Sequence, residues 1–225
     1  MVDDQAQHLV RQAARALARA GLVHAYGHCS LRLDADSFLV CAAMPMGLID
    51  TQPGVVVHVD RALPEGVLGE VRAHQSIYRL RPDVHGICRI MPPALMALST
   101  QAIVPRARHG IGAYFGHHLP LWNDPRLLRD DQSAAGLAAA LGDAPAIVMR
   151  GNGAVVVADA LEKAVTLSWF LEDAARVELA VRSIGADPES GVLDADETSA
   201  RQVFAGGVVE RMWAYLTAGD QPLAQ

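Results

Sequence analysis

Two pairs of short apolar runs, each joined by a tight turn, constrain the fold of this chain more than any other feature. The first pair spans residues 30–43 around the turn sequence DADS, and the second spans residues 144–158 around RGNG. Each pair predicts a β-hairpin, whose strands are antiparallel. Helical segments interleave with these strands, so the chain is predicted to form an α/β fold with a mixed sheet sandwiched by helices.

Apolar residues that recur every three or four positions mark the helices, and glycines and prolines mark their ends. The predicted helices are 4–20, 67–80, 92–100, 131–141, 161–184 and 195–217. Further strands are predicted at 55–60 and 84–90, with short extended pieces between glycines over residues 103–122. Residues 185–198 are the most linker-like segment, and they are predicted to connect the last two helices within one domain that spans residues 1–225.

The composition narrows the class of protein. Hydrophobic residues make up 51% of the chain, which is enough to build a core. The chain has 19 Lys and Arg against 25 Asp and Glu, which predicts no nucleic-acid partner. No apolar run approaches the roughly 18–20 residues of a membrane helix, and the N-terminus lacks a secretory signal pattern. Cys29, Cys41 and Cys88 form no CxxC pair, which argues against a thiolate zinc cluster and suits a cytoplasmic protein.

Several polar residues stand in apolar or glycine-rich surroundings. Glu70 and His74 lie four apart, so they share one face of a predicted helix, as an ordinary exposed pair also would. Arg89 interrupts an apolar strand, where it needs an anionic partner unless it sits at a strand end. Asn152 lies between two glycines, which is also typical of a simple turn residue. None of these signals alone identifies a site, and nucleotide-binding, GxSxG and HExxH motifs are absent.

The order of these segments resembles the class II aldolase/adducin family over about residues 5–182. The most specific blocks are Glu70 to His74 followed by IYRLRPDV, and the segment from RGNG to FLEDAARV. The resemblance implies a three-layer αβα sandwich around a largely antiparallel sheet. It also implies a cyclic homotetramer with active sites between neighbouring subunits.

The chain departs from this family at its metal site. In the metal enzymes of the family three histidines bind a zinc-type ion, and their positions here hold Arg89, Met91 and Asn152. A guanidinium has no lone pair to give, a thioether is soft and an amide oxygen is weak, so the usual zinc site is predicted to be absent and no cofactor is expected. The phosphate-binding residues of the sugar-phosphate enzymes are also replaced, which argues against a phosphorylated sugar.

The remaining pattern looks more like the branch of the family that contains decarboxylases of aromatic catabolism. We therefore predict a carbon–carbon lyase that decarboxylates a small hydroxylated aromatic or unsaturated oxo-carboxylic acid. Arg89 would clamp the carboxylate, and Glu70 would act as proton donor or base with His74 orienting it. Binding roles are also assigned to a further set of polar residues: Asn152, His28, Ser30 and His109.

Two alternatives remain open at the level of sequence. One is a metal-dependent aldolase or oxygenase whose divalent ion is held at a relocated site. Its ligands would come from the remaining histidines: His28, His74, His109, His117 and His118. The other is a non-catalytic, adducin-like interaction module that has lost its metal site.

Overall fold

The computed structural model describes residues 2–220, and these residues form one seven-stranded sheet flanked by helices. The strands are β1 (His28–Arg32), β2 (Ser37–Val40), β3 (Val55–His58), β4 (Gly86–Ile90), β5 (Leu121–Trp122), β6 (Ala146–Met149) and β7 (Ala154–Ala158). Their order across the sheet is β3-β2-β1-β4-β7-β6-β5. Every neighbouring pair is antiparallel except β5 and β6. The predicted largely antiparallel mixed sheet is therefore confirmed.

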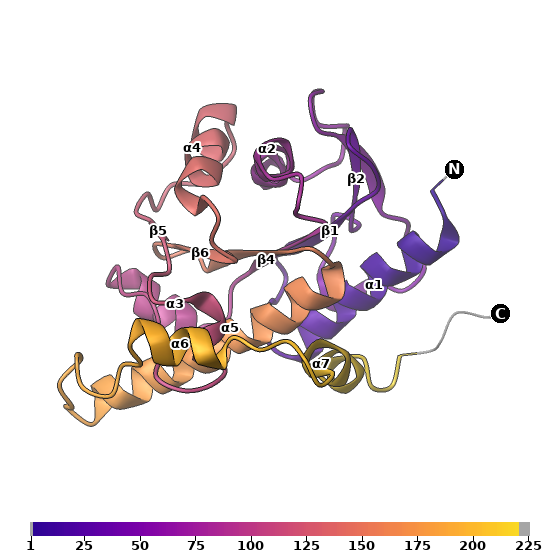
Figure 1. Ribbon diagram of the computed structural model, residues 1–225. Helices are drawn as coiled ribbons and strands as arrows, with labels where there is room; N and C mark the ends of the chain where they lie inside the picture. The colour runs from indigo at the N-terminus through magenta and orange to yellow at the C-terminus, as the bar shows by residue number, and fades with distance from the viewer. Residues whose placement is uncertain (1, 221–225) are drawn as a thin grey trace.

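Helices cover both faces of the sheet (Figure 1). They are α1 (Asp4–Arg19), α2 (Arg72–Leu80), α3 (Pro93–Thr100), α4 (Asp131–Leu141), α5 (Leu161–Ser183), α6 (Ala195–Arg201) and α7 (Val208–Leu216). In Figure 1, α2 and α4 lie above the sheet, whereas α1, α3 and α5 lie below it with α6 and α7 beyond them. This arrangement confirms the predicted three-layer αβα sandwich.

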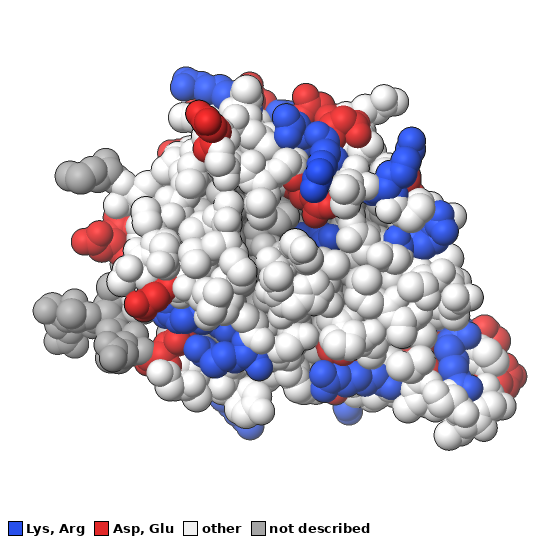
Figure 2. Space-filling view, turned by 180° about the vertical axis from the view of Figure 1, so that it is seen from behind, with Lys and Arg blue, Asp and Glu red and all other residues white. Residues whose placement is uncertain are grey.

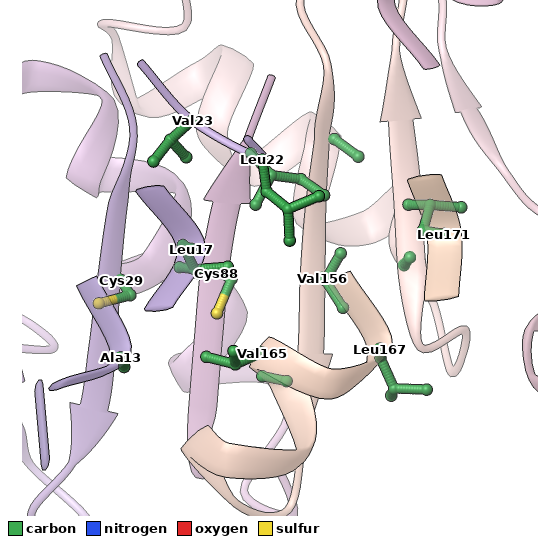
Figure 3. Packing of buried hydrophobic residues seen from close by; sticks show 14 of the residues in the cluster. Ala13, Leu17, Leu22, Val23, Cys29, Cys88, Val156, Val165, Leu167 and Leu171 are labelled. Atoms are coloured by element: carbon green, nitrogen blue, oxygen red, sulfur yellow. The ribbon is translucent and has the colours of Figure 1, made fainter. Parts of the chain in front are cut away.

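Successive side chains of each strand point to opposite faces of the sheet, and each face has its own apolar core. Cys29, Cys88 and Val156 are cross-strand neighbours on β1, β4 and β7, and they face the layer of α1 and α5. Figure 3 shows these side chains packed against Leu17 and Val165 of the two helices. The residues next to them along each strand point to the opposite face, toward α2 and α4. That second face carries the polar residues considered below.

The structure corrects the predicted C-terminal helix 195–217. It is divided into α6 and α7 by residues 202–207, which end in Gly206 and Gly207. Both glycines have positive φ angles, which a continuing helix of L-residues does not adopt. The predicted start at residue 195 is confirmed, because Asp194 caps α6 through a reciprocal contact with Glu197.

The structure also changes one predicted extended piece and the beginning of one predicted helix. The sequence predicts an extended piece around residues 113–116, but these residues lie in and next to a 3-10 turn, Gly112–Phe115. The predicted helix 67–80 begins later, with a 3-10 turn over Gly69–Val71 that leads into α2. Glu70 therefore lies in the 3-10 turn and not in α2. Across residues 2–220, no helix combines the length and the apolar character needed to span a bilayer.

Candidate active site

A cavity of about 810 Å³ opens at one end of the sheet. The start of β1, the end of β4 and the turn between β6 and β7 meet there, because antiparallel neighbours bring opposite chain ends together. Loops from the first half of the chain and the segment before α4 close its sides. Its lining residues are Ala25, Tyr26, Gly27, His28, Ala43, Met44, Pro45, Leu68, Gly69, Glu70, Arg89, Met91, Leu127, Arg129 and Asn152.

Strand register places His28 and Arg89 side by side. The two residues are direct partners across β1 and β4, and Val155 of β7 is the next partner along the same row. Directly opposite residues in a sheet point to the same face, so both side chains lie on the face covered by α2. Both are 3% exposed, which makes this a buried polar pair rather than a strand end at the surface.

The Arg89 guanidinium is held by three neighbours. Its Nη2 donates to Asn152 Oδ1 at 2.7 Å and lies 3.5 Å from Glu70 Oε2, and its Nη1 donates to the Ile90 carbonyl at 3.0 Å. Burial lowers the pKa of Arg89, and the Glu70 carboxylate opposes that effect. Arginine nevertheless keeps its charge in proteins, so the floor of the cavity carries a fixed positive charge.

The RGNG turn presents Asn152 to this guanidinium. Gly153 has φ +75°, and a Cβ atom there would lie 2.0 Å from the Ile90 carbonyl oxygen, so only glycine fits. The hydrogen bond from Arg89 fixes the Asn152 amide with its oxygen toward the guanidinium. Its Nδ2 then faces away from Arg89 as a donor with no partner among the described residues.

A buried hydrogen-bond chain runs from the cavity under α2. His28 Nδ1 lies 3.0 Å from His74 Nε2, and His74 Nδ1 lies 2.7 Å from Ser30 Oγ. The Ser30 hydroxyl lies 2.9 Å from the Tyr78 hydroxyl, which donates to the Ser30 carbonyl at 3.1 Å. Burial, together with the charge of Arg89, lowers the pKa of His74 to about 3. Burial followed by the influence of His74 and Arg89 also lowers the pKa of His28 well below its usual value, so both imidazoles are neutral.

Three of the sequence-predicted residues are placed differently from expectation. His74 has hydrogen bonds with His28 and Ser30 and not with Glu70, because Glu70 lies in the 3-10 turn that precedes α2. Ser30 is fully buried behind His74 and does not line the cavity. His109 lines a different cavity, of about 850 Å³ next to α6 and α7, where its Nε2 lies 2.9 Å from Asp173 Oδ2.

The donor set does not fit the three-histidine zinc site of the family. The guanidinium of Arg89 is hydrogen-bonded to Asn152 there, and its positive charge repels a cation. The relocated set is not assembled either, since His28 and His74 bond to each other and His109 lines the other cavity. Within residues 2–220, no three or more His, Cys, Asp or Glu side chains are grouped to hold a metal ion.

Sequence reasoning missed several residues that line the cavity. Arg129 is a second cation among the lining residues, and it is exposed. Tyr26, Leu68 and Leu127 give the rim large apolar side chains that are 70%, 40% and 55% exposed. These residues come from loops without periodicity, so no sequence signal marked them.

The family described as Class II Aldolase and Adducin N-terminal domain matches residues 8–179. The chain belongs to this family. A 3,4-dihydroxyphthalate decarboxylase from Arthrobacter keyseri is 30% identical over 80% of this chain and 80% of its own length. Another decarboxylase of that name, from Rhodococcus jostii, is 28% identical over 80% of this chain and 82% of its length. The family and these relatives show that the chain is an enzyme of the lyase class.

Solved structures support the fold independently. An L-fuculose 1-phosphate aldolase from Glaciozyma antarctica superposes with a TM-score of 0.79 at 18% identity, covering 94% of this chain and 88% of its own. An L-fuculose-1-phosphate aldolase from Thermus thermophilus gives 0.74 at 25% identity, covering 83% and 99%. This chain therefore shares the sandwich fold with sugar-phosphate aldolases.

Proposed function

We propose that this enzyme is a carboxy-lyase that removes carbon dioxide from a small acid carrying a hydroxyl or oxo group next to the carboxylate. The observation that carries the proposal is the buried Arg89 beside Glu70, Asn152 and His28. Three of the cavity's buried polar atoms have no hydrogen-bond partner among the described residues: His28 Nε2, Arg89 Nε and Asn152 Nδ2. Buried polar atoms are almost always satisfied in folded proteins, so a ligand with matching groups is expected to complete them.

The two unpartnered donors favour an anionic ligand. Arg89 Nε and Asn152 Nδ2 both offer N–H groups, and a carboxylate accepts such bonds strongly when the donor is charged. The burial of Arg89, which is 3% exposed, strengthens this contact, because little water reaches the guanidinium itself. The proposed roles of Arg89 and Asn152 are therefore to hold the carboxylate, or the neighbouring oxygen, in one orientation.

Loss of carbon dioxide requires a place for the electron pair of the broken carbon–carbon bond. In an ortho-hydroxy aromatic acid, the hydroxyl gives up its proton while the ring carbon that bears the carboxylate gains one. The resulting ketone oxygen takes up the electron pair as carbon dioxide leaves, and the ring becomes aromatic again. The acid and one proton thus give the phenol and carbon dioxide, and the cavity has to supply one proton to carbon.

Glu70 is the proposed proton donor. Its side chain is 20% exposed, so the carboxyl group reaches both the cavity and water, and it is 3.5 Å from the guanidinium that would hold the substrate. The Glu70→Gln substitution keeps the shape and removes the proton. We expect kcat to fall by roughly 10²–10⁴, as for the loss of other general acids. Full turnover of this variant would remove Glu70 from the mechanism.

A second cation favours a dicarboxylate among these acids. Arg129 lines the same cavity at its edge, where it can contact a carboxylate that projects from a ligand bound at Arg89. The relatives from Arthrobacter keyseri and Rhodococcus jostii are named for 3,4-dihydroxyphthalate, which carries two carboxylates. We therefore propose a hydroxylated aromatic dicarboxylate as the substrate class.

Release of carbon dioxide from a panel of acids tests the proposal. The panel contains ortho-hydroxylated aromatic mono- and dicarboxylates together with an unsaturated oxo-acid, and protein purified without chelator is analysed for metal in parallel. We expect release from the ortho-hydroxylated acids, fastest from the dicarboxylate. No release from any member, with no ligand-induced stabilisation of the fold, would contradict the proposed function.

We also propose that the enzyme works as a homotetramer in the cytoplasm. The large apolar side chains at the rim of the cavity, Tyr26, Leu68 and Leu127, suit a contact with a neighbouring subunit. Figure 2 shows that one face of the molecule has a broad uncharged area with charged side chains around its margin. The three buried cysteines are all unpaired, which suits a reducing compartment.

A further inference from the structure

The chain of hydrogen bonds under α2 has a direction that its last member determines. Tyr78 has one hydroxyl proton and two neighbours within hydrogen-bonding distance, the Ser30 hydroxyl and the Ser30 carbonyl. A carbonyl oxygen can only accept, so without that proton two oxygen lone pairs would face each other at 3.1 Å. The Tyr78 proton therefore belongs to the carbonyl, and the Ser30 hydroxyl must donate to the Tyr78 oxygen.

This direction is carried through the two imidazoles. Since the Ser30 proton is used on Tyr78, the Ser30 oxygen accepts from His74, which places the proton of His74 on Nδ1. His74 Nε2 is then a lone pair, and it accepts from a proton on His28 Nδ1. A neutral imidazole carries one proton, so His28 Nε2 is a lone pair too. The reverse direction would leave a buried, unpartnered N–H at His28 and a repulsive contact at Tyr78.

The free lone pair belongs to a residue that lines the cavity. His28 is one of the lining residues, and its Nε2 is buried with no hydrogen-bond partner among residues 2–220. The groups beside it are the donors of Arg89 and Asn152. The floor therefore offers an acceptor next to donors, which is the complement of a hydroxyl next to a carboxylate.

We propose that the chain Tyr78–Ser30–His74–His28 locks His28 into one tautomer, whose Nε2 lone pair selects substrates with a hydroxyl beside the carboxylate. This deepens the proposed function, and its selectivity part rests on that function. In the reaction, the hydroxyl shares its proton with His28 Nε2 through this hydrogen bond while the ring carbon is protonated, and the proton is on the phenol oxygen again after carbon dioxide has left. His74, Ser30 and Tyr78 act as positioning residues, since none of them lines the cavity.

The tautomers of His28 and His74 can be measured in the protein without substrate. The result therefore does not depend on whether the proposed decarboxylation is correct. In the full chain labelled with ¹⁵N-histidine, long-range ¹H–¹⁵N correlations distinguish a protonated Nδ1 from a protonated Nε2. We expect His28 and His74 both to carry the proton on Nδ1. Signals of the Nε2-protonated form, or of an imidazolium, for either residue at neutral pH would overturn the inference.

Variants test whether the tyrosine sets the direction. Tyr78→Phe removes the hydroxyl that anchors the chain, so the Nε2-protonated forms of both histidines should become populated. Tyr215→Phe is the matched control, because Tyr215 is 70% exposed and outside the chain of hydrogen bonds. Ser30→Ala breaks the same chain one step earlier and replaces Tyr78→Phe if that variant does not fold. Unchanged tautomers in both variants would contradict the anchoring role.

A ligand pair tests the selectivity. Binding of 2-hydroxybenzoate and of its methyl ether, 2-methoxybenzoate, is measured for the wild type and for Tyr78→Phe. The hydroxy acid should bind roughly tenfold more tightly in the wild type, because only it donates to the lone pair, and this ratio should shrink in the variant. Equal binding of the two acids to the wild type would overturn the selectivity.

Discussion

A charged group in the protein interior needs hydrogen bonds and an opposite charge from its neighbours. Arg89 has only some of these contacts. Its guanidinium bonds to Asn152 and the Ile90 carbonyl and lies 3.5 Å from Glu70, yet its Nε has no partner among the described residues. An incompletely satisfied buried cation has a cost in the empty protein that an anionic ligand removes. A ligand carboxylate is therefore expected to bind more tightly at Arg89 than at an arginine on the surface.

Substitution of Arg89 tests this at the level of a single residue. Arg89→Met removes the charge and keeps an unbranched side chain of similar reach, so KM should rise by roughly 10–150-fold, the range expected for a hydrogen bond to a charged group. Steady-state kinetics on the best acid of the panel give the value. Arg126→Met is the matched control, because Arg126 is exposed and paired with Asp124 outside the cavity. An unchanged KM in Arg89→Met would make Arg89 purely structural.

The neutral imidazole of His74 makes folding stability depend on pH. Its pKa of about 3 in the folded protein lies below the value of 6.5 for an exposed histidine, so the unfolded chain binds the proton more readily. The stability is fully present above pH 6.5 and is lost as the pH falls toward 3. The loss contributed by His74 should reach about 2 kcal/mol by pH 5.

Urea unfolding at pH 7 and pH 5 measures this loss. The free energy of unfolding of His74→Gln should change less between the two pH values than that of the wild type. His85→Gln is the control, because His85 is exposed and should keep the wild-type dependence. A pH dependence in His74→Gln as steep as that of the wild type would contradict a buried neutral His74.

At the scale of elements, a buried carboxylate joins helix α5 to the first turn of α3. Glu172 of α5 is 2% exposed, and its two carboxylate oxygens accept from the backbone N–H groups of Ala94 and Leu95 in the first turn of α3. The first turn of a helix has free N–H groups and a partial positive charge, so a carboxylate stabilises it. Because α3 follows β4 directly, this contact also fixes the end of the strand that carries Arg89.

Glu172→Gln should therefore destabilise the protein by about 0.5–2 kcal/mol, the range measured for the loss of a helix cap. The amide keeps one oxygen acceptor and turns the other position into a donor that faces an N–H group. Chemical denaturation gives the change in the free energy of unfolding, with Glu65→Gln in an exposed loop as the control. Equal stability of the two variants would mean that the cap contributes nothing.

At the scale of the whole molecule, the cavity is open toward a rim of exposed apolar side chains. Tyr26 and Leu127 are among the most exposed large hydrophobic residues of the described chain, and both stand at the cavity. Exposed apolar side chains gathered at one place are typical of a surface that another molecule covers. A neighbouring copy of the chain would shield the cavity from water and so strengthen the contacts of Arg89.

Sedimentation equilibrium tests the assembly. The protein should sediment with about four times the 24.0 kDa mass of one chain. Replacing the rim residue Leu127 with Glu places a charge in an apolar contact, which should lower that mass and the rate of decarboxylation together. A wild-type protein that sediments as a single chain would contradict the proposed tetramer.

The sequence by itself determined the local structure and the family. Both hairpins, most helices and the mixed sheet follow from apolar periodicity and turn residues, which report on neighbours a few positions apart. The prediction that Arg89, Met91 and Asn152 stand where the metal enzymes of the family have three histidines likewise uses only the order of residues along the chain. These features depend only on the order of residues along the chain.

Only the tertiary structure decided which polar side chains meet. Strand register places His28 beside Arg89, and the 3-10 turn before α2 separates Glu70 from His74, which joins Ser30 instead. The fold also carries His109 to the other cavity and brings Arg129 to this one. Contacts between residues tens of positions apart depend on how strands pair and helices pack, and periodicity in one sequence carries no record of either.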